Sequence, residues 1–225
     1  MCGKFTAMFS WSEVVAFTQA LDGSGTDDRE VTYRVVSEVP VITLDIVTGK
    51  RRVVPMRWGF PDPKDWRRPR PIHARSETID TTRAFAQAFI DGQRGIVLMK
   101  SFNEAPDVPG PPVQHTITPD AGEILAAAFV WRKFEIEDAP DPFFACVLCT
   151  VPANELIARL PTDRMPAFLA KEDWGTWLGE VPATLDKVKA CLKTVEGVRW
   201  TMAKEGKRST VVRGKPVVSD PKGLF

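Results

Sequence analysis

The alternation of hydrophobic and polar residues predicts a chain made mainly of short β-strands. Runs rich in β-branched and aromatic residues, bounded by Gly, Pro or polar clusters, are typical of strands. Such runs occupy residues 31–36, 39–47, 50–58, 95–102, 116–118, 124–132, 143–151, 198–202 and 211–218. Thr48 and Gly49 separate the second run from the third and predict a hairpin turn there.

Helical periodicity is confined to a few segments. Residues 8–21 carry apolar side chains at the spacing of an amphipathic helix, and Gly23 follows as a stop. Shorter helices are predicted at residues 81–90, 154–160, 171–178 and 185–193. Many short strands with few helices indicate an α+β fold. We expect one domain over residues 1–225, with a mostly antiparallel β-sheet or barrel-like core and short flanking helices.

The composition is that of a globular protein. The chain has 225 residues, of which 44% are hydrophobic and 26% charged, enough for a substantial core. No apolar run approaches the roughly 20 residues of a membrane span, and no secretory signal precedes the patterned sequence. Four cysteines without such a signal predict a reducing, cytoplasmic location. We expect a monomer with no membrane partner.

The overall charge argues against a purely electrostatic nucleic-acid binder. Lys and Arg number 30 and Asp and Glu 29, a formal net charge of +1, so any DNA binding needs a local concentration of positive charge. Basic residues do gather in one stretch, at Arg51, Arg52, Arg57, Lys64, Arg67, Arg68, Arg70 and Arg75. A solvated loop would account for this run equally well.

Cys2 follows the initiator Met1, and removal of Met1 would leave an α-amine and a thiol on one residue. The pKa of an α-amine is about 7.7–8.0 and that of a thiol about 8.5, so both nucleophiles are available near neutral pH. The amine can form a Schiff base with an aldehyde, which the thiol then closes into a thiazolidine. Two alternatives remain: a chance cysteine, or an N-terminal nucleophile amidohydrolase whose thiol attacks an amide.

Further segments favour the aldehyde chemistry by resemblance. Residues 56–61 (Met-Arg-Trp-Gly-Phe-Pro) resemble an Arg-Trp-Gly-Leu-Ile-Pro motif, and residues 73–78 (His-Ala-Arg-Ser-Glu-Thr) an Asn-Ala-Arg-x-Glu-Thr motif. Residues 101–104 (Ser-Phe-Asn-Glu) stand at the end of a predicted strand, where the motif order places Gly-Phe-Tyr-Glu. Residues 163–166 (Asp-Arg-Met-Pro) resemble the end of a His-x-Arg-Met-Pro motif. In this order and spacing, the chain resembles the SOS-response-associated peptidase (SRAP) family.

The resemblance implies an abasic-site sensor that forms a covalent crosslink with single-stranded DNA. Cys2 would be the crosslinking nucleophile and Glu104 the general acid/base, in a protein with autopeptidase and lyase character. The family chemistry needs neither an organic cofactor nor a metal. The resemblance also implies association with the nucleoid when the protein is bound to DNA. A solvated loop carboxylate is the plainer interpretation of Glu104.

Five residues are candidates for DNA contacts on the same resemblance. Arg75 and Arg164 would bind the phosphates beside the lesion, because arginine suits charge-assisted contacts. Trp58, Trp66 and Phe102 would stack on bases or wedge between them. A salt-bridge partner is the alternative for Arg164, and a core position is the alternative for Trp58.

The chain departs from the family pattern at its histidines. His73 stands where the family has Asn, and the family His before Arg-Met-Pro is missing, with Thr162 nearest. His73 could serve as the proton carrier, since a His pKa lies near neutrality, or could bond a neighbouring backbone group. His115 is expected to be incidental. The C-x-x-C pair, Cys146 and Cys149, lies in an apolar run and is interpreted as packing.

Overall fold

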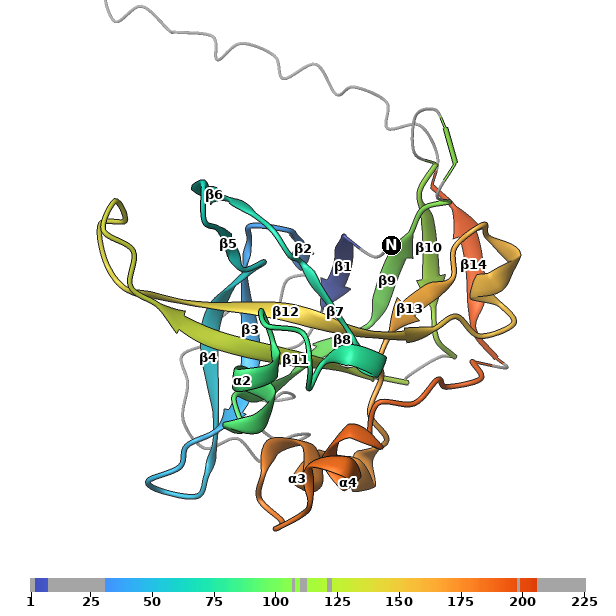
Figure 1. Cartoon of the computed structure of the whole chain (residues 1–225). Helices are drawn as coiled ribbons and strands as arrows, with labels where there is room; N and C mark the ends of the chain where they lie inside the picture. Colours follow the sequence, from blue (N-terminus) through green and yellow to red (C-terminus); the bar gives the residue numbers. More distant parts are fainter. Residues whose placement is uncertain are drawn as a thin grey trace, which may run out of the picture.

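Two large β-sheets and one small hairpin make up the described chain (Figure 1). The computed structural model describes residues 3–7, 31–106, 108–109, 113–120, 123–197 and 199–205. The predicted helix at 8–21 and the predicted strand at 211–218 lie outside these residues, as does Cys2.

The first sheet has five antiparallel strands. In spatial order they are β14 (Thr201–Lys204), β10 (His115–Thr118), β9 (Ser101–Glu104), β1 (Lys4–Ala7) and β2 (Val31–Arg34). Alternate residues face the core, so Phe5, Phe102 and Ile117 are fully buried while their neighbours face outward. The sheet therefore has one apolar face and one polar face.

The second sheet has seven strands and closes on itself. Its strands are β11 (Leu125–Phe134), β8 (Arg94–Met99), β3 (Glu38–Leu44), β4 (Arg51–Trp58), β12 (Phe143–Pro152), β13 (Arg164–Pro166) and β7 (His73–Arg75). Because β11 also pairs with β12, the strands β11, β8, β3, β4 and β12 form a closed ring. Within that ring only the β4–β12 pairing is parallel. The predicted α+β fold with a barrel-like core is confirmed.

The remaining elements are short. A hairpin of β5 (Pro61–Asp62) and β6 (Asp65–Pro69), which the sequence pattern did not predict, lies between β4 and β7. The helices are η1 (Ser76–Thr78), α2 (Ala86–Ile90), η2 (Ile157–Arg159), η3 (Lys171–Asp173), α3 (Trp174–Leu178) and α4 (Leu185–Lys189). They fall within predicted helical segments, η1 excepted, but are shorter, because turns take up the flanking residues. No helix in the described part of the chain could span a membrane.

The buried apolar side chains form one cluster that joins the two sheets. The rings of Phe5 and Trp58 lie 5.4 Å apart, and those of Trp58 and Phe129 lie 6.3 Å apart. The chain passes directly from β8 in the barrel to β9 in the first sheet. That the whole chain is one domain stays a prediction, but the described residues share this core.

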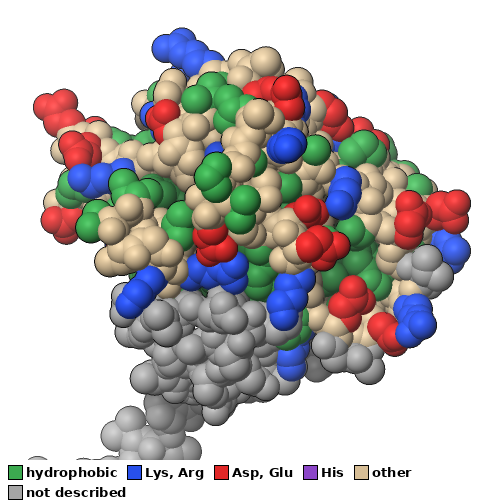
Figure 2. Space-filling model, turned by 90° about the horizontal axis from the view of Figure 1, so that it is seen from below, with side chains coloured by type: hydrophobic (Ala, Val, Ile, Leu, Met, Phe, Trp, Pro, Cys, Tyr) green, Lys and Arg blue, Asp and Glu red, His purple; other side chains and the backbone are tan. Residues whose placement is uncertain are grey.

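Charge is mixed on the face seen from below, which carries α3 and α4. Figure 2 shows Lys and Arg side chains interspersed there with Asp and Glu. This mixture agrees with the formal net charge of +1.

Candidate active site and nucleic-acid interface

Glu104 ends strand β9 and is completely buried. Its Oε1 accepts a hydrogen bond of 3.2 Å from the backbone nitrogen of Ala105. Strand β1 pairs Lys4 with Asn103, and one step further along this antiparallel register brings Gly3 opposite Glu104. A buried carboxyl group is costly in free energy unless it is paired, and such groups concentrate at functional sites.

His115 is the direct cross-strand partner of Glu104 on β10. Residues opposite each other in an antiparallel pair project from the same face, with Cβ atoms about 4.5–5.5 Å apart. The Nδ1 atom of His115 lies 3.1 Å from the backbone oxygen of Val113, an acceptor that favours a proton on Nδ1 and a lone pair on Nε2. This juxtaposition could not be predicted from the sequence, because a strand register is not visible in a local pattern.

His73 and Arg75 lie on β7, which runs parallel to β12 in the second sheet. His73 is half-buried opposite Leu148, and Arg75 is exposed opposite Thr150. Strand alternation directs both side chains to the same face. No hydrogen bond or ion pair to another described residue holds the Arg75 guanidinium, so this group is available to an anion.

Arg164 is buried and paired with Glu77. Its Nη1 donates to Glu77 Oε1 over 2.5 Å and its Nη2 donates to Glu77 Oε2 over 2.9 Å. Nη2 also donates to the backbone oxygen of Thr150, 2.6 Å away. These bonds hold the pKa of Glu77 below its ordinary value. The two motif segments, 73–78 and 163–166, are thus joined by a bidentate salt bridge across β12.

Two of the predicted stacking residues lie in the core. Trp58 and Phe102 are both 0% exposed. The Trp58 indole donates a hydrogen bond of 3.2 Å to the backbone oxygen of Ile72. Phe102 packs on Phe168 and Trp200, with ring centroids 5.3 and 5.9 Å away. Of the two interpretations of Trp58, its placement matches the core position.

Trp66 lies instead in an open groove of about 710 Å³, between β4, β6 and the β11–β12 hairpin. The guanidinium carbons of Arg57 and Arg67 lie 5.3 and 4.9 Å from the Trp66 ring centre. Phe143 lines the same groove, with its ring 5.8 Å from that of Trp66. Burial lowers the pKa of Arg57, and Asp65 opposes that shift. We call this surface the Trp66 groove.

Two hydrogen-bond donors in the Trp66 groove have no acceptor among the described residues. They are Nε1 of Trp66 and Nε of Arg57, and both atoms are buried. Val36, which lines the groove, has a φ of 79°, a strained conformation for a β-branched residue. Unmet donors and local strain are typical of binding sites.

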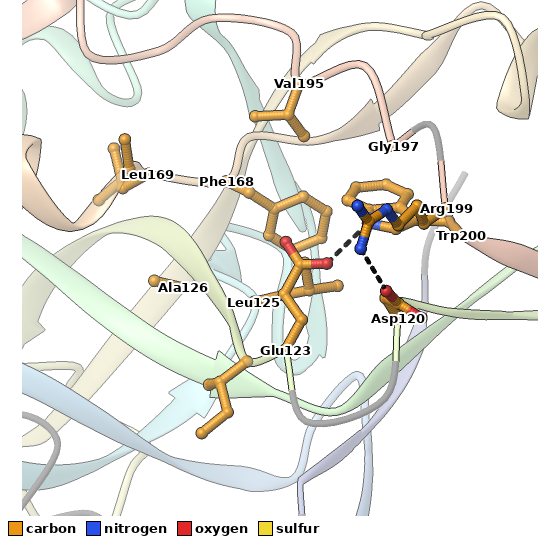
Figure 3. A pocket seen from close by; sticks show the side chains of 12 residues that line it. Asp120, Glu123, Leu125, Ala126, Phe168, Leu169, Val195, Gly197, Arg199 and Trp200 are labelled. Carbon is orange, nitrogen blue, oxygen red and sulfur yellow. Dashed lines mark hydrogen bonds and ion pairs between the residues drawn. The ribbon is translucent and has the colours of Figure 1, made fainter.

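Figure 3 shows a second cavity, of about 570 Å³. Phe168 and Trp200 line it, and both rings also contact Phe102. At its mouth Arg199 pairs with Asp120 at 3.2 Å, and the Trp200 indole donates to Glu123 over 3.4 Å. This cavity is backed by the aromatic residues that cover one side of β9.

The C-x-x-C thiols are packed inside β12. Cys146 and Cys149 are both 0% exposed, and burial raises the pKa of each thiol. Residues three apart on a regular strand project from opposite faces, so these thiols do not converge on one ligand position. Their placement agrees with the interpretation as packing.

Comparison with known families identifies the chain. The family model described as SOS response associated peptidase (SRAP) matches residues 1–207. The chain belongs to the SRAP family. Membership supports an SOS-response and DNA-damage-associated role for this SRAP protein, and the family description names a peptidase. No curated protein matches the chain.

Solved structures share the SRAP protein's fold. A protein from Bordetella bronchiseptica superposes with a TM-score of 0.75 at 19% identity, covering 92% of this chain and 100% of its own. A protein from Bacteroides thetaiotaomicron superposes with a TM-score of 0.74 at 18% identity, covering 90% of this chain and 91% of its own. A phage-related protein from B. bronchiseptica superposes with a TM-score of 0.64 at 17% identity, covering 92% of this chain and 95% of its own. At these identities the likeness concerns the fold alone.

Proposed function

We propose that this SRAP protein captures abasic sites in single-stranded DNA through a covalent crosslink at Cys2. The register of β1 against β9 is the observation that carries the proposal. This register pairs Lys4 with Asn103, and its continuation by one residue would set Gly3 opposite the buried Glu104. Covalent geometry keeps the Cα atom of residue 2 about 3.8 Å from that of Gly3. The N-terminal nucleophile is therefore tethered close to a buried acid/base.

The chemistry needs only groups of the chain and the ring-opened sugar aldehyde. The Cys2 amine adds to the aldehyde carbon, and Glu104 donates a proton to the hydroxyl that leaves as water, giving an imine. The thiol then adds to the imine carbon while its proton passes to the nitrogen, which closes a thiazolidine. General acid–base help of this kind is worth about 10²–10⁴-fold in rate. Removal of Met1 is the N-terminal processing that this chemistry requires.

The DNA strand would be held by Arg75 and the Trp66 groove. Arg75 is exposed and suits a phosphate contact. Trp66 and its two arginines offer stacking and positive charge to the strand. Arg164 could contact a phosphate only in exchange for Glu77, and Phe102 and Trp58 could stack only after moving out of the core.

Incubation with an oligonucleotide carrying one abasic site tests the proposal. We expect a band that survives denaturant with wild type and is lost with Cys2→Ser. Cys191→Ser is the matched control, since Cys191 is a buried thiol elsewhere and should leave the band intact. Glu104→Gln should slow band formation about 10²-fold or more.

Other outcomes of the same assay would replace the proposal. Salt-sensitive binding without a covalent band would indicate a non-covalent single-stranded DNA binder. Ammonia release from amides without DNA binding would indicate an N-terminal nucleophile amidohydrolase.

The proton carrier can be assigned with two histidine variants. His73→Asn restores the family residue on β7, and His115→Phe removes the imidazole opposite Glu104. If His73 carries the proton, His73→Asn should slow crosslinking about 10-fold or more, with His115→Phe near wild type. The reverse order would assign the role to His115. Wild-type rates in both variants would exclude a histidine proton carrier.

A further inference from the structure

The polar face of the first sheet carries a row of side chains that crosses β1, β9 and β10 and ends at Glu205, directly after β14. The register aligns Lys4 on β1 with Asn103 on β9, and Asn103 with Thr116 on β10. Thr116 in turn pairs with Ala203 on β14, two residues before Glu205. By strand alternation Lys4, Asn103, Thr116 and Glu205 all project from one face.

One carboxylate oxygen of Glu205 accepts hydrogen bonds from the other three side chains of this row. Glu205 Oε1 accepts from Lys4 Nζ over 2.5 Å, from Asn103 Nδ2 over 2.8 Å and from Thr116 Oγ1 over 3.3 Å. Asn103 Nδ2 also donates to Thr116 Oγ1 over 2.9 Å. Asn103 is 1% exposed, so its amide depends on these partners. The hydrogen bond from Lys4 holds the pKa of Glu205 below its ordinary value.

The network adjoins both proposed reacting residues along the chain. Lys4 is two residues from Cys2, at most about 7 Å along an extended chain, and Asn103 directly precedes Glu104. We propose that Glu205 is a positioning residue that fixes Lys4 and Asn103 and neutralises the charge of Lys4 beside the N-terminal nucleophile. This inference rests on the proposed function and adds an electrostatic control of the same site.

A second cation lies on the same face as Lys4. Arg34 on β2 is its cross-strand partner on the same face. His115, Lys204 and Glu104 project from the opposite face of the sheet. Glu205 is the carboxylate that accepts from Lys4 in this network, so Glu205→Gln removes a negative charge from the sheet face that carries Lys4 and Arg34.

The sign of the effect follows from electrostatics. A nearby positive charge stabilises the neutral amine and the thiolate, so it lowers the pKa of both. Glu205→Gln keeps an acceptor oxygen but loses the negative charge. It should therefore lower the pH midpoint of crosslinking by about half a pH unit at low salt, the interaction of unit charges about 7 Å apart in water. Lys4→Met should raise the midpoint, and the double variant should return it toward wild type.

The experiment measures crosslinking rate against pH for these variants with an abasic oligonucleotide. Glu135→Gln, which breaks an exposed ion pair with Lys133, makes the same charge change elsewhere and should not move the midpoint. The shift in Glu205→Gln should shrink at 1 M salt, where charges are screened within about 3 Å, whereas a purely structural effect would persist.

A second readout separates this inference from the proposed function. The pKa of the α-amine is measured without DNA, from the pH dependence of its acylation followed by mass spectrometry on protein that lacks Met1. A lowered amine pKa in Glu205→Gln supports the inference even if wild type forms no crosslink. The absence of a wild-type crosslink would contradict only the proposed function. An unchanged amine pKa together with an unchanged rate profile overturns the inference.

Discussion

At the scale of single residues, the salt bridge between Arg164 and Glu77 explains why two distant motif segments occur together. Arg164 is 5% exposed, whereas the Glu77 side chain is 48% exposed. The bidentate geometry lets a half-exposed carboxylate satisfy a buried guanidinium. These residues thereby tie β13 to the segment that follows β7, which carries His73 and Arg75.

This salt bridge makes stability depend on pH. The pKa of Glu77 is lowered in the folded protein, so ionised Glu77 contributes stability above its unfolded pKa of about 4.3. That contribution is lost as pH falls through the lowered folded pKa. Glu77→Gln should lower the free energy of unfolding by about 1–2 kcal/mol at pH 7.

Urea unfolding at pH 7 and at pH 3 measures this effect. The difference between wild type and Glu77→Gln should narrow at the acidic pH. Glu155→Gln changes an exposed carboxylate that has no partner among the described residues. Its free energy of unfolding should match that of wild type at both pH values. An equal difference in free energy of unfolding between wild type and Glu77→Gln at pH 3 and pH 7 would show that packing, not charge, holds Arg164.

At the scale of elements, a buried arginine links the barrel to two helices. Arg94, the first residue of β8, is 6% exposed. Its Nε donates to the backbone oxygen of Trp177 over 2.5 Å, and its Nη1 to that of Phe89 over 2.7 Å. These oxygens lie in the last turns of α3 and α2, where carbonyls lack partners within the helix and favour a cation.

Replacing this arginine should loosen both helices from the barrel. Arg94→Met keeps much of the apolar volume but removes the charged donor from the backbone oxygens of Trp177 and Phe89. It leaves the Phe89 oxygen with the long bond of 3.4 Å from Gly92 N. We expect a loss of about 2–4 kcal/mol in the free energy of unfolding. Arg83→Met, at an exposed site, should change it by less than about 0.5 kcal/mol. A small effect at Arg94 would mean that water replaces the guanidinium.

At the scale of the whole molecule, closure of the barrel determines which thiols can react. Cys146, Cys149 and Cys191 are all buried, and burial raises the pKa of each thiol. A buried thiol with a raised pKa supplies little thiolate and is inert. Because β12 pairs with strands on both edges, exposing Cys146 requires the barrel to open.

Thiol labelling can test this prediction. At pH 8 in native buffer, an alkylating reagent should modify Cys2 within minutes. Cys146 and Cys149 should be modified only at the rate of global unfolding. Mass spectrometry of peptides locates the label, and all four cysteines should react in urea. Rapid native labelling of Cys146 would show that the barrel opens locally.

The sequence by itself determined the local structure and the family. Strand periodicity placed most strands within a few residues, since alternation decides which side chains of a strand share a face. The motif at 101–104 singled out Glu104, and adjacent Met1 and Cys2 singled out the nucleophile. These features depend on neighbours in the chain, so a local pattern suffices to find them.

Only the tertiary structure decided how the strands pair. It set His115 opposite Glu104, joined Arg164 to Glu77, and brought Glu205 to Lys4 across 201 residues. It also buried Trp58 and Phe102 while leaving Trp66 in a groove. Register and closure arise from the packing of the whole core, and a one-residue slip would reverse every face. No local pattern contains that information.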